Sequence, residues 1–138
     1  MDRLFVYGSL KAGFPNAHVN TGTRLAGEFI TRHRLPLYLV GSGLLPCLLL
    51  EPGQGLQVVG QLFRVGAADL AAMDRLERVG LPGGYRRVRI EVLQRHEPGA
   101  PPIEAHAYVQ QPDKLQGPGP LLGPLAEYTL EHASRLAW

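Results

Sequence analysis

Residues 4–10 read Leu-Phe-Val-Tyr-Gly-Ser-Leu, and a loop rich in Gly, Pro and Asn follows them up to about Gly22. The first four residues are all apolar or aromatic, which is typical of a β-strand buried on both faces. Gly8 lets the backbone turn tightly, and it also lets a ligand come close to backbone N–H groups. The stretch therefore predicts a buried strand ending in a turn that either only redirects the chain or binds a ligand.

The rest of the chain has the pattern of an α+β protein. A helix is expected over 67–78, which has good helix formers and no Gly or Pro, and a final helix is expected over 125–136. We predict one domain, residues 1–138, built as a small mixed β-barrel with flanking helices, because closure removes exposed sheet edges. Beyond the first strand, strand-like patterns cover these segments: 24–40 (one or two strands), 56–65, 85–95 and 103–110.

Composition and charge narrow the class of protein. The 138 residues are 45% hydrophobic, which fits a folded chain with one core. The formal charge is only +2 and the arginines are dispersed, so nucleic acid is not an expected partner. A nucleic-acid barrel using Arg86, Arg87 and Arg89 is disfavoured because stacking aromatics are few. No apolar run reaches the roughly 20 residues that span a bilayer, and no signal peptide is visible, so a cytoplasmic protein without membrane contact is expected.

Motifs for nucleotide, metal or serine chemistry are missing. The chain has no phosphate-binding loop of the G-x-x-x-x-G-K-[ST] type and no G-x-S-x-G elbow. Its histidines, at 18, 33, 96, 106 and 132, lack the close spacing of zinc ligands. Cys47 lies within an apolar run and is interpreted as a buried structural thiol. We therefore predict neither a metal nor a cofactor.

The helix expected over 67–78 carries a carboxylate on its apolar side. Helical periodicity places Leu70, Met73 and Leu76 on one stripe. Glu77 falls between Leu70 and Met73, at the end of the helix. It could simply reach water or pair with an arginine there. Alternatively it lies in a cavity wall, where burial and the helix C-terminus would raise its pKa and make it an acid or base near neutral pH.

Four short motifs occur in a fixed order between residues 4 and 110. They are Tyr7-Gly8-Ser9-Leu10, Gly60-Gln61-Leu62-Phe63-Arg64-Val65, Met73-Asp74-Arg75-Leu76-Glu77, and Pro82 with Tyr85-Arg86-Arg87. Their order and spacing resemble the γ-glutamylcyclotransferase-like superfamily, which includes γ-glutamylamine cyclotransferases and bacterial AIG2-like proteins.

The resemblance implies a fold, a reaction and site residues. The family fold is a small β-barrel with flanking helices, and the family reaction releases 5-oxoproline from a γ-glutamyl amine or γ-glutamyl amino acid without a cofactor. Carried over by motif, Glu77 would be the general acid/base. The turn of Tyr7, Gly8, Ser9 and Leu10 would bind this small-molecule substrate through backbone N–H groups, and Tyr85 would contribute to binding. The alternative is a non-catalytic member that binds a small ligand or a partner protein.

Two departures from the family pattern lie next to Glu77. The family usually has Gly after the catalytic glutamate, whereas this chain has Arg78. The loop from Glu77 to Pro82 is also longer than the compact family pattern. Both changes fall at the mouth of the expected pocket, so they bear on the choice of substrate.

Tyr108 and His106 share the polar side of the strand expected over 103–110. In a small barrel that side faces either solvent or a ligand cavity. In the second case both residues would line or border the pocket, and the Tyr108 hydroxyl would touch substrate.

Overall fold

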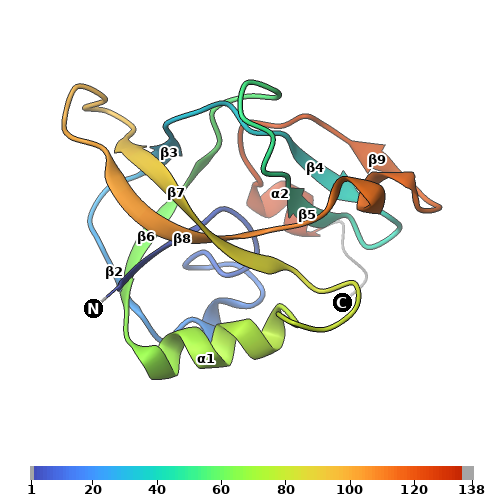
Figure 1. Ribbon diagram of the computed structural model, residues 1–138, viewed down its shortest axis with the longest axis horizontal. Helices are drawn as coiled ribbons and strands as arrows, with labels where there is room; N and C mark the ends of the chain where they lie inside the picture. Colours follow the sequence, from blue (N-terminus) through green and yellow to red (C-terminus); the bar gives the residue numbers. More distant parts are fainter. Residues whose placement is uncertain (1, 135–138) are drawn as a thin grey trace.

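A closed ring of β-strands forms the centre of the molecule in the computed structural model, which describes residues 2–134 (Figure 1). The ring strands are β1 (Asp2–Val6), β3 (Phe29–Thr31), β6 (Val59–Val65), β7 (Arg86–Gln94) and β8 (Ile103–Val109). Strand β1 pairs in parallel with β8. The other neighbouring pairs, β8–β7, β7–β3, β3–β6 and β6–β1, are antiparallel, and the last of them closes the ring. The predicted mixed β-barrel is thus confirmed.

Smaller elements flank the ring. A second sheet has the order β5-β4-β9, and the short β2 extends the edge of β6. In Figure 1, α1 runs beneath the ring, while the second sheet and α2 lie on another side of it. Within residues 2–134, no helix is both long and apolar enough to cross a membrane. The flanking elements are β2 (Thr23–Arg24), β4 (Leu37–Val40), β5 (Leu45–Leu48), β9 (Leu121–Leu122), α1 (Ala67–Leu76) and α2 (Leu130–Ser134), with 3-10 turns η1 (Ala17–Val19) and η2 (Pro112–Gln116).

The first strand is buried on both faces, as its apolar run predicts. Phe5 points into the main core cluster, while Leu4 and Val6 pack in a second cluster with Leu70 and Met73 of α1. Alternate side chains of one strand therefore stabilise both the barrel interior and the helix layer. This double anchoring holds the end of β1, and the turn after it, in one position.

The expected helix over 125–136 is wrong in its first part. Leu125 donates its backbone N–H to the carbonyl of Leu37, and the carbonyl of Ala126 accepts from Val59, so this segment is tied to β4 and β6. These long-range hydrogen bonds override local helix propensity, and α2 begins only at Leu130. Residues 135–138 lie outside the described residues.

Candidate active site

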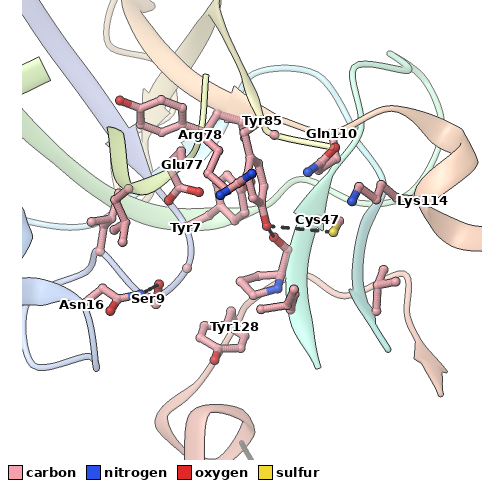
Figure 2. A pocket seen from close by; sticks show the side chains of 18 of the residues that line it. Tyr7, Ser9, Asn16, Cys47, Glu77, Arg78, Tyr85, Gln110, Lys114 and Tyr128 are labelled. Carbon is pink, nitrogen blue, oxygen red and sulfur yellow. Dashed lines mark hydrogen bonds between the residues drawn. The ribbon is translucent and has the colours of Figure 1, made fainter. Parts of the chain in front are cut away.

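A cavity of about 630 Å³ opens where the end of β1, the end of α1 and β5 meet (Figure 2). His106 does not line it. That side chain instead lies beside Arg87, with 3.3 Å between its Nδ1 and the arginine Nη1. The expectation that His106 borders the pocket is therefore wrong. The predicted site residues that do line the cavity are Tyr7, Gly8, Ser9, Leu10, Glu77, Tyr85 and Tyr108.

Glu77 caps the C-terminus of α1 and presents its carboxylate to the cavity (Figure 2). Its backbone N–H donates to the carbonyl of Met73 at 2.9 Å, so the residue keeps the helical position that periodicity predicts. Within residues 2–134 the carboxylate makes no hydrogen bond or ion pair. Burial raises its pKa from 4.5 to about 7. A carboxylate with this pKa can both accept and donate a proton near neutral pH.

The loop after Glu77 is tightly folded. Arg78 has a φ of 58°, in the left-handed region that glycine adopts most readily. Gly84 lies so close to the backbone of Arg78 that a Cβ on Gly84 would collide with the Arg78 carbonyl oxygen. Tyr85 then donates its backbone N–H to the carbonyl of Glu77 at 2.9 Å. The longer loop thus returns the chain to the glutamate and places Tyr85 beside it.

The turn after β1 presents free backbone donors. Hydrogen bonds from the backbone N–H and side-chain amide of Asn16 to the carbonyl and hydroxyl of Ser9, at 2.9 and 2.8 Å, hold the turn in place. The N–H groups of Gly8, Ser9 and Leu10 find no acceptor among the described residues. Because this turn lines the cavity, these donors are available to a ligand there.

Glycine is needed at position 8 because there is no room for a side chain, and not because the backbone is strained. Its φ lies outside the left-handed region. A Cβ at this position would approach Cγ of Pro46, on β5, to 2.9 Å. The missing side chain lets β5 pack against the turn.

The hydroxyls of the three predicted tyrosines are all bonded to the protein. Tyr7 donates to the carbonyl of Tyr108 at 2.6 Å, and Tyr85 donates to the carbonyl of Pro46 at 2.7 Å. Tyr108 donates to Oδ1 of Asp74 at 2.7 Å, so its hydroxyl is not aimed at a ligand as expected. Burial raises the pKa of all three hydroxyls, which keeps them protonated as donors. The tyrosines therefore build the cavity walls.

Replacing Tyr108 with phenylalanine is expected to change stability more than activity. The lost hydrogen bond to the Asp74 carboxylate should lower the free energy of unfolding by about 1–2 kcal/mol, while Arg87 still pairs with Asp74 at 3.0 Å. Urea unfolding and steady-state kinetics of the variant would check this. A KM that rises tenfold in an equally stable Tyr108→Phe protein would place the hydroxyl on the substrate after all.

The sequence analysis did not identify several other residues that line the cavity. Pro46 and Cys47 on β5, Gln110 after β8 and Lys114 in η2 come from segments without a motif. Cys47, predicted as a structural thiol, lies 4.0 Å from the Tyr85 hydroxyl oxygen, and burial raises the pKa of its thiol. The apolar run around Cys47 does not predict a cavity, because the cavity forms only when β5 packs against the loop after α1.

Comparisons with known proteins agree with this architecture. The family model described as "Gamma-glutamyl cyclotransferase, AIG2-like" matches residues 4–128. The Danio rerio protein named Gamma-glutamylaminecyclotransferase C is 35% identical over 126 residues, which cover 83% of this chain and 81% of the relative. The Homo sapiens protein named Gamma-glutamylaminecyclotransferase is 35% identical over 117 residues, covering 80% and 75%.

A solved structure shows the same fold. The crystal structure of an AIG2-like protein from Mus musculus superposes with a TM-score of 0.78 at 28% identity, covering 99% of this chain and 93% of the mouse chain. The family match, the sequence relatives and this structure all extend over most of the chain. The chain therefore belongs to the γ-glutamyl cyclotransferase, AIG2-like family.

Proposed function

We propose that this enzyme of the γ-glutamylcyclotransferase type cyclises the γ-glutamyl group of a γ-glutamyl amine or γ-glutamyl amino acid, releasing 5-oxoproline and the free amine. The observation that carries the proposal is the pairing of two features in one cavity. These are the Glu77 carboxylate, which has no partner among the described residues, and the free N–H groups of Gly8, Ser9 and Leu10. The names of the relatives as γ-glutamylaminecyclotransferases support it.

The cavity walls would fold the substrate for ring closure. The substrate α-amine attacks its own γ-carbonyl carbon, a new C–N bond closes the five-membered ring, and the original amide C–N bond breaks. Holding amine and carbonyl in contact supplies much of the acceleration, because the reaction is intramolecular and needs mainly orientation. The packed walls of Tyr7, Tyr85 and Tyr108 suit this purpose, since their hydroxyls are already bonded to the protein.

Glu77 would move the protons. The carboxylate takes a proton from the attacking α-amine and gives it to the departing nitrogen, so the glutamate ends each cycle in its starting state. Meanwhile the negative charge that develops on the γ-carbonyl oxygen would be stabilised by the N–H groups of the turn. The proposed steps use only these protein groups and the substrate.

The raised pKa of Glu77 predicts the pH dependence of turnover. The base form is required for attack, so kcat/KM should rise with pH and level off above an apparent pKa of about 7. For a glutamate exposed to water, the rise of kcat/KM would instead follow a pKa of about 4.3. A pH profile of kcat/KM from pH 4 to 9 checks the expectation. A rate that stays constant down to pH 5 would contradict the role of a buried base.

The direct test is 5-oxoproline release from a panel of γ-glutamyl compounds. We expect release from at least one γ-glutamyl amine or γ-glutamyl amino acid, with one free amine formed for each 5-oxoproline. The non-catalytic alternative predicts binding of such compounds, measured by calorimetry, without any release. If calorimetry detects binding but no compound in the panel is turned over, the protein binds these compounds without converting them, and the proposed reaction is wrong.

A further inference from the structure

An apolar strip made of Cys47, Leu45, Val40 and Leu121 leads out of the cavity across the second sheet (Figure 1). Cys47 and Leu45 are two positions apart on β5, so their side chains lie on the same face of the strand, and both residues line the cavity. Only 3% of the surface of Cys47 is exposed, whereas 54% of Leu45 is exposed. The strip therefore runs from the cavity interior at Cys47 to the cavity mouth at Leu45.

Cross-strand pairing continues the strip beyond the mouth. Val40 on β4 pairs with Leu45 of β5 on one side and with Leu121 of β9 on the other. Directly paired residues of antiparallel strands lie on the same face of a sheet. Val40 also lines the cavity, and 46% of Leu121 is exposed. The cavity thus opens onto a row of apolar side chains that water covers in the free protein.

The inner end of the strip lies close to Glu77. The Cys47 sulfur is 4.0 Å from the hydroxyl oxygen of Tyr85, and Tyr85 donates its backbone N–H to the carbonyl of Glu77 at 2.9 Å. One tyrosine side chain therefore separates the strip from the glutamate. In the proposed mechanism Glu77 protonates the departing nitrogen. The group attached to that nitrogen thus begins near Cys47 and can extend along the strip toward the mouth.

The cavity has more room than the γ-glutamyl group needs. Its volume of about 630 Å³ lies within the range of pockets that enclose drug-sized ligands, about 300–1,000 Å³. The γ-glutamyl group is a small acyl chain whose reacting atoms would lie between Glu77 and the turn after β1. The remaining space is available to the leaving group. Covering exposed apolar side chains with an apolar ligand is favourable, because both surfaces leave water.

We infer that the apolar strip is a subsite for the leaving amine, so that the preferred substrates are γ-glutamyl amines whose amine carries an aliphatic chain of several carbons. This inference rests on the proposed function and specifies the kind of amine that is released. The strip touches the chain and not the reacting atoms, so its contacts are the same before and during the reaction. Such contacts lower KM and leave kcat nearly unchanged.

A matched pair of substrates tests the subsite. γ-Glutamyl-hexylamine and γ-glutamyl-methylamine differ only by five methylene groups. A fully buried methylene contributes about fourfold in affinity, so a chain with one side in water should gain about twofold for each. We therefore expect kcat/KM for 5-oxoproline release to be about 30-fold higher with the hexylamine, mainly through a lower KM. The hydroxyl-terminated analogue γ-glutamyl-(5-hydroxypentyl)amine, which has the same length, should be a poorer substrate than the hexylamine.

Two variants locate the preference on the strip. The double variant Leu45→Gln/Leu121→Gln places polar side chains there, and the ratio of kcat/KM for hexylamine to methylamine should fall below about fivefold. Both leucines are exposed, so this variant should fold, which a thermal melt verifies. Leu130→Gln makes the same change at a leucine of α2 that is 57% exposed and lies outside the cavity, and it should leave the ratio unchanged.

The results separate the two proposals. Equal wild-type kcat/KM for hexylamine and methylamine overturns the subsite but leaves the cyclotransferase activity standing. A ratio that the double variant does not change also overturns it, because the chain would then bind elsewhere. A dimer that the double variant converts to a monomer in analytical ultracentrifugation, together with equal turnover of both amines, would assign the strip to contact between two copies. Release of no 5-oxoproline from any γ-glutamyl compound would instead overturn the proposed function itself.

Discussion

Replacing Glu77 with glutamine is expected to lower kcat/KM by at least about 100-fold, because general acid–base catalysis contributes roughly that much or more. The amide has nearly the same shape as the carboxylate, so the cavity and the capping position at the end of α1 should persist. What the variant loses is the ability to take the proton from the substrate amine. The measurement is 5-oxoproline release by the purified variant, with circular dichroism to confirm that the fold is retained.

The same substitution should raise stability near neutral pH. The pKa of Glu77 is about 7 in the folded protein and near 4.5 in the unfolded chain, so the folded state binds more protons between these values. The wild-type protein therefore loses stability as the pH rises from about 4.5 to 7, up to an order of 2–3 kcal/mol. Glutamine carries no charge to bury, so Glu77→Gln should gain that amount above pH 7 and lack this pH dependence.

A control separates catalysis from general effects of charge. Glu97 is exposed in the turn between β7 and β8 and lies outside the cavity. Glu97→Gln should leave both kcat/KM and the pH dependence of unfolding as in the wild type. If Glu77→Gln keeps activity within about threefold of wild type, Glu77 is not the acid/base group, whatever its effect on stability.

Local sequence patterns predict the parts of this molecule that depend on local geometry. The apolar run at residues 4–7 predicts a doubly buried strand, and Leu4, Phe5 and Val6 divide between two core clusters as that pattern requires. Helical periodicity likewise places Glu77 on the inward side of α1. Both results follow from the fixed spacing at which side chains return to the same face of a strand or a helix, which can be recognised from sequence alone.

Features that depend on long-range packing are not visible in the sequence. The Tyr108 hydroxyl finds Asp74 on α1, a contact between residues 34 positions apart. The segment from Leu125 is held to β4 and β6 and therefore does not form the expected helix. Lys114, in η2, lines the cavity beside Gly83, with its Nζ 3.3 Å from where a Cβ on that glycine would lie. Each depends on tertiary contacts that no local period encodes.

Replacing Gly8 with valine is expected to abolish most activity in a protein that still folds. A Cβ at this position already approaches Pro46 Cγ to 2.9 Å, and the two methyl groups of valine would add to the overlap. Overpacking of this kind costs about 1–3 kcal/mol of stability. The turn can relieve the overlap only by moving away from β5, which displaces the N–H donors of Gly8, Ser9 and Leu10.

The expected loss of activity exceeds what destabilisation alone would cause. One misplaced oxyanion donor typically costs about 100- to 1,000-fold in rate. A displaced Pro46 would also disturb Tyr85, whose hydroxyl donates to the Pro46 carbonyl at 2.7 Å. We therefore expect Gly8→Val to lower kcat/KM by two orders of magnitude or more while the protein still melts cooperatively at a reduced temperature.

Gly99 provides the matched control for this valine. It lies in the turn between β7 and β8, its φ is outside the left-handed region, and a Cβ there would meet no atom within 4 Å. Gly99→Val should therefore keep wild-type kcat/KM and nearly wild-type melting temperature. If Gly8→Val lowers the melting temperature but keeps near-normal activity, the turn is only structural, because a binding loop could not tolerate the shift. If activity falls far more than stability, the turn after β1 holds the reacting group, since the barrel itself would still be intact.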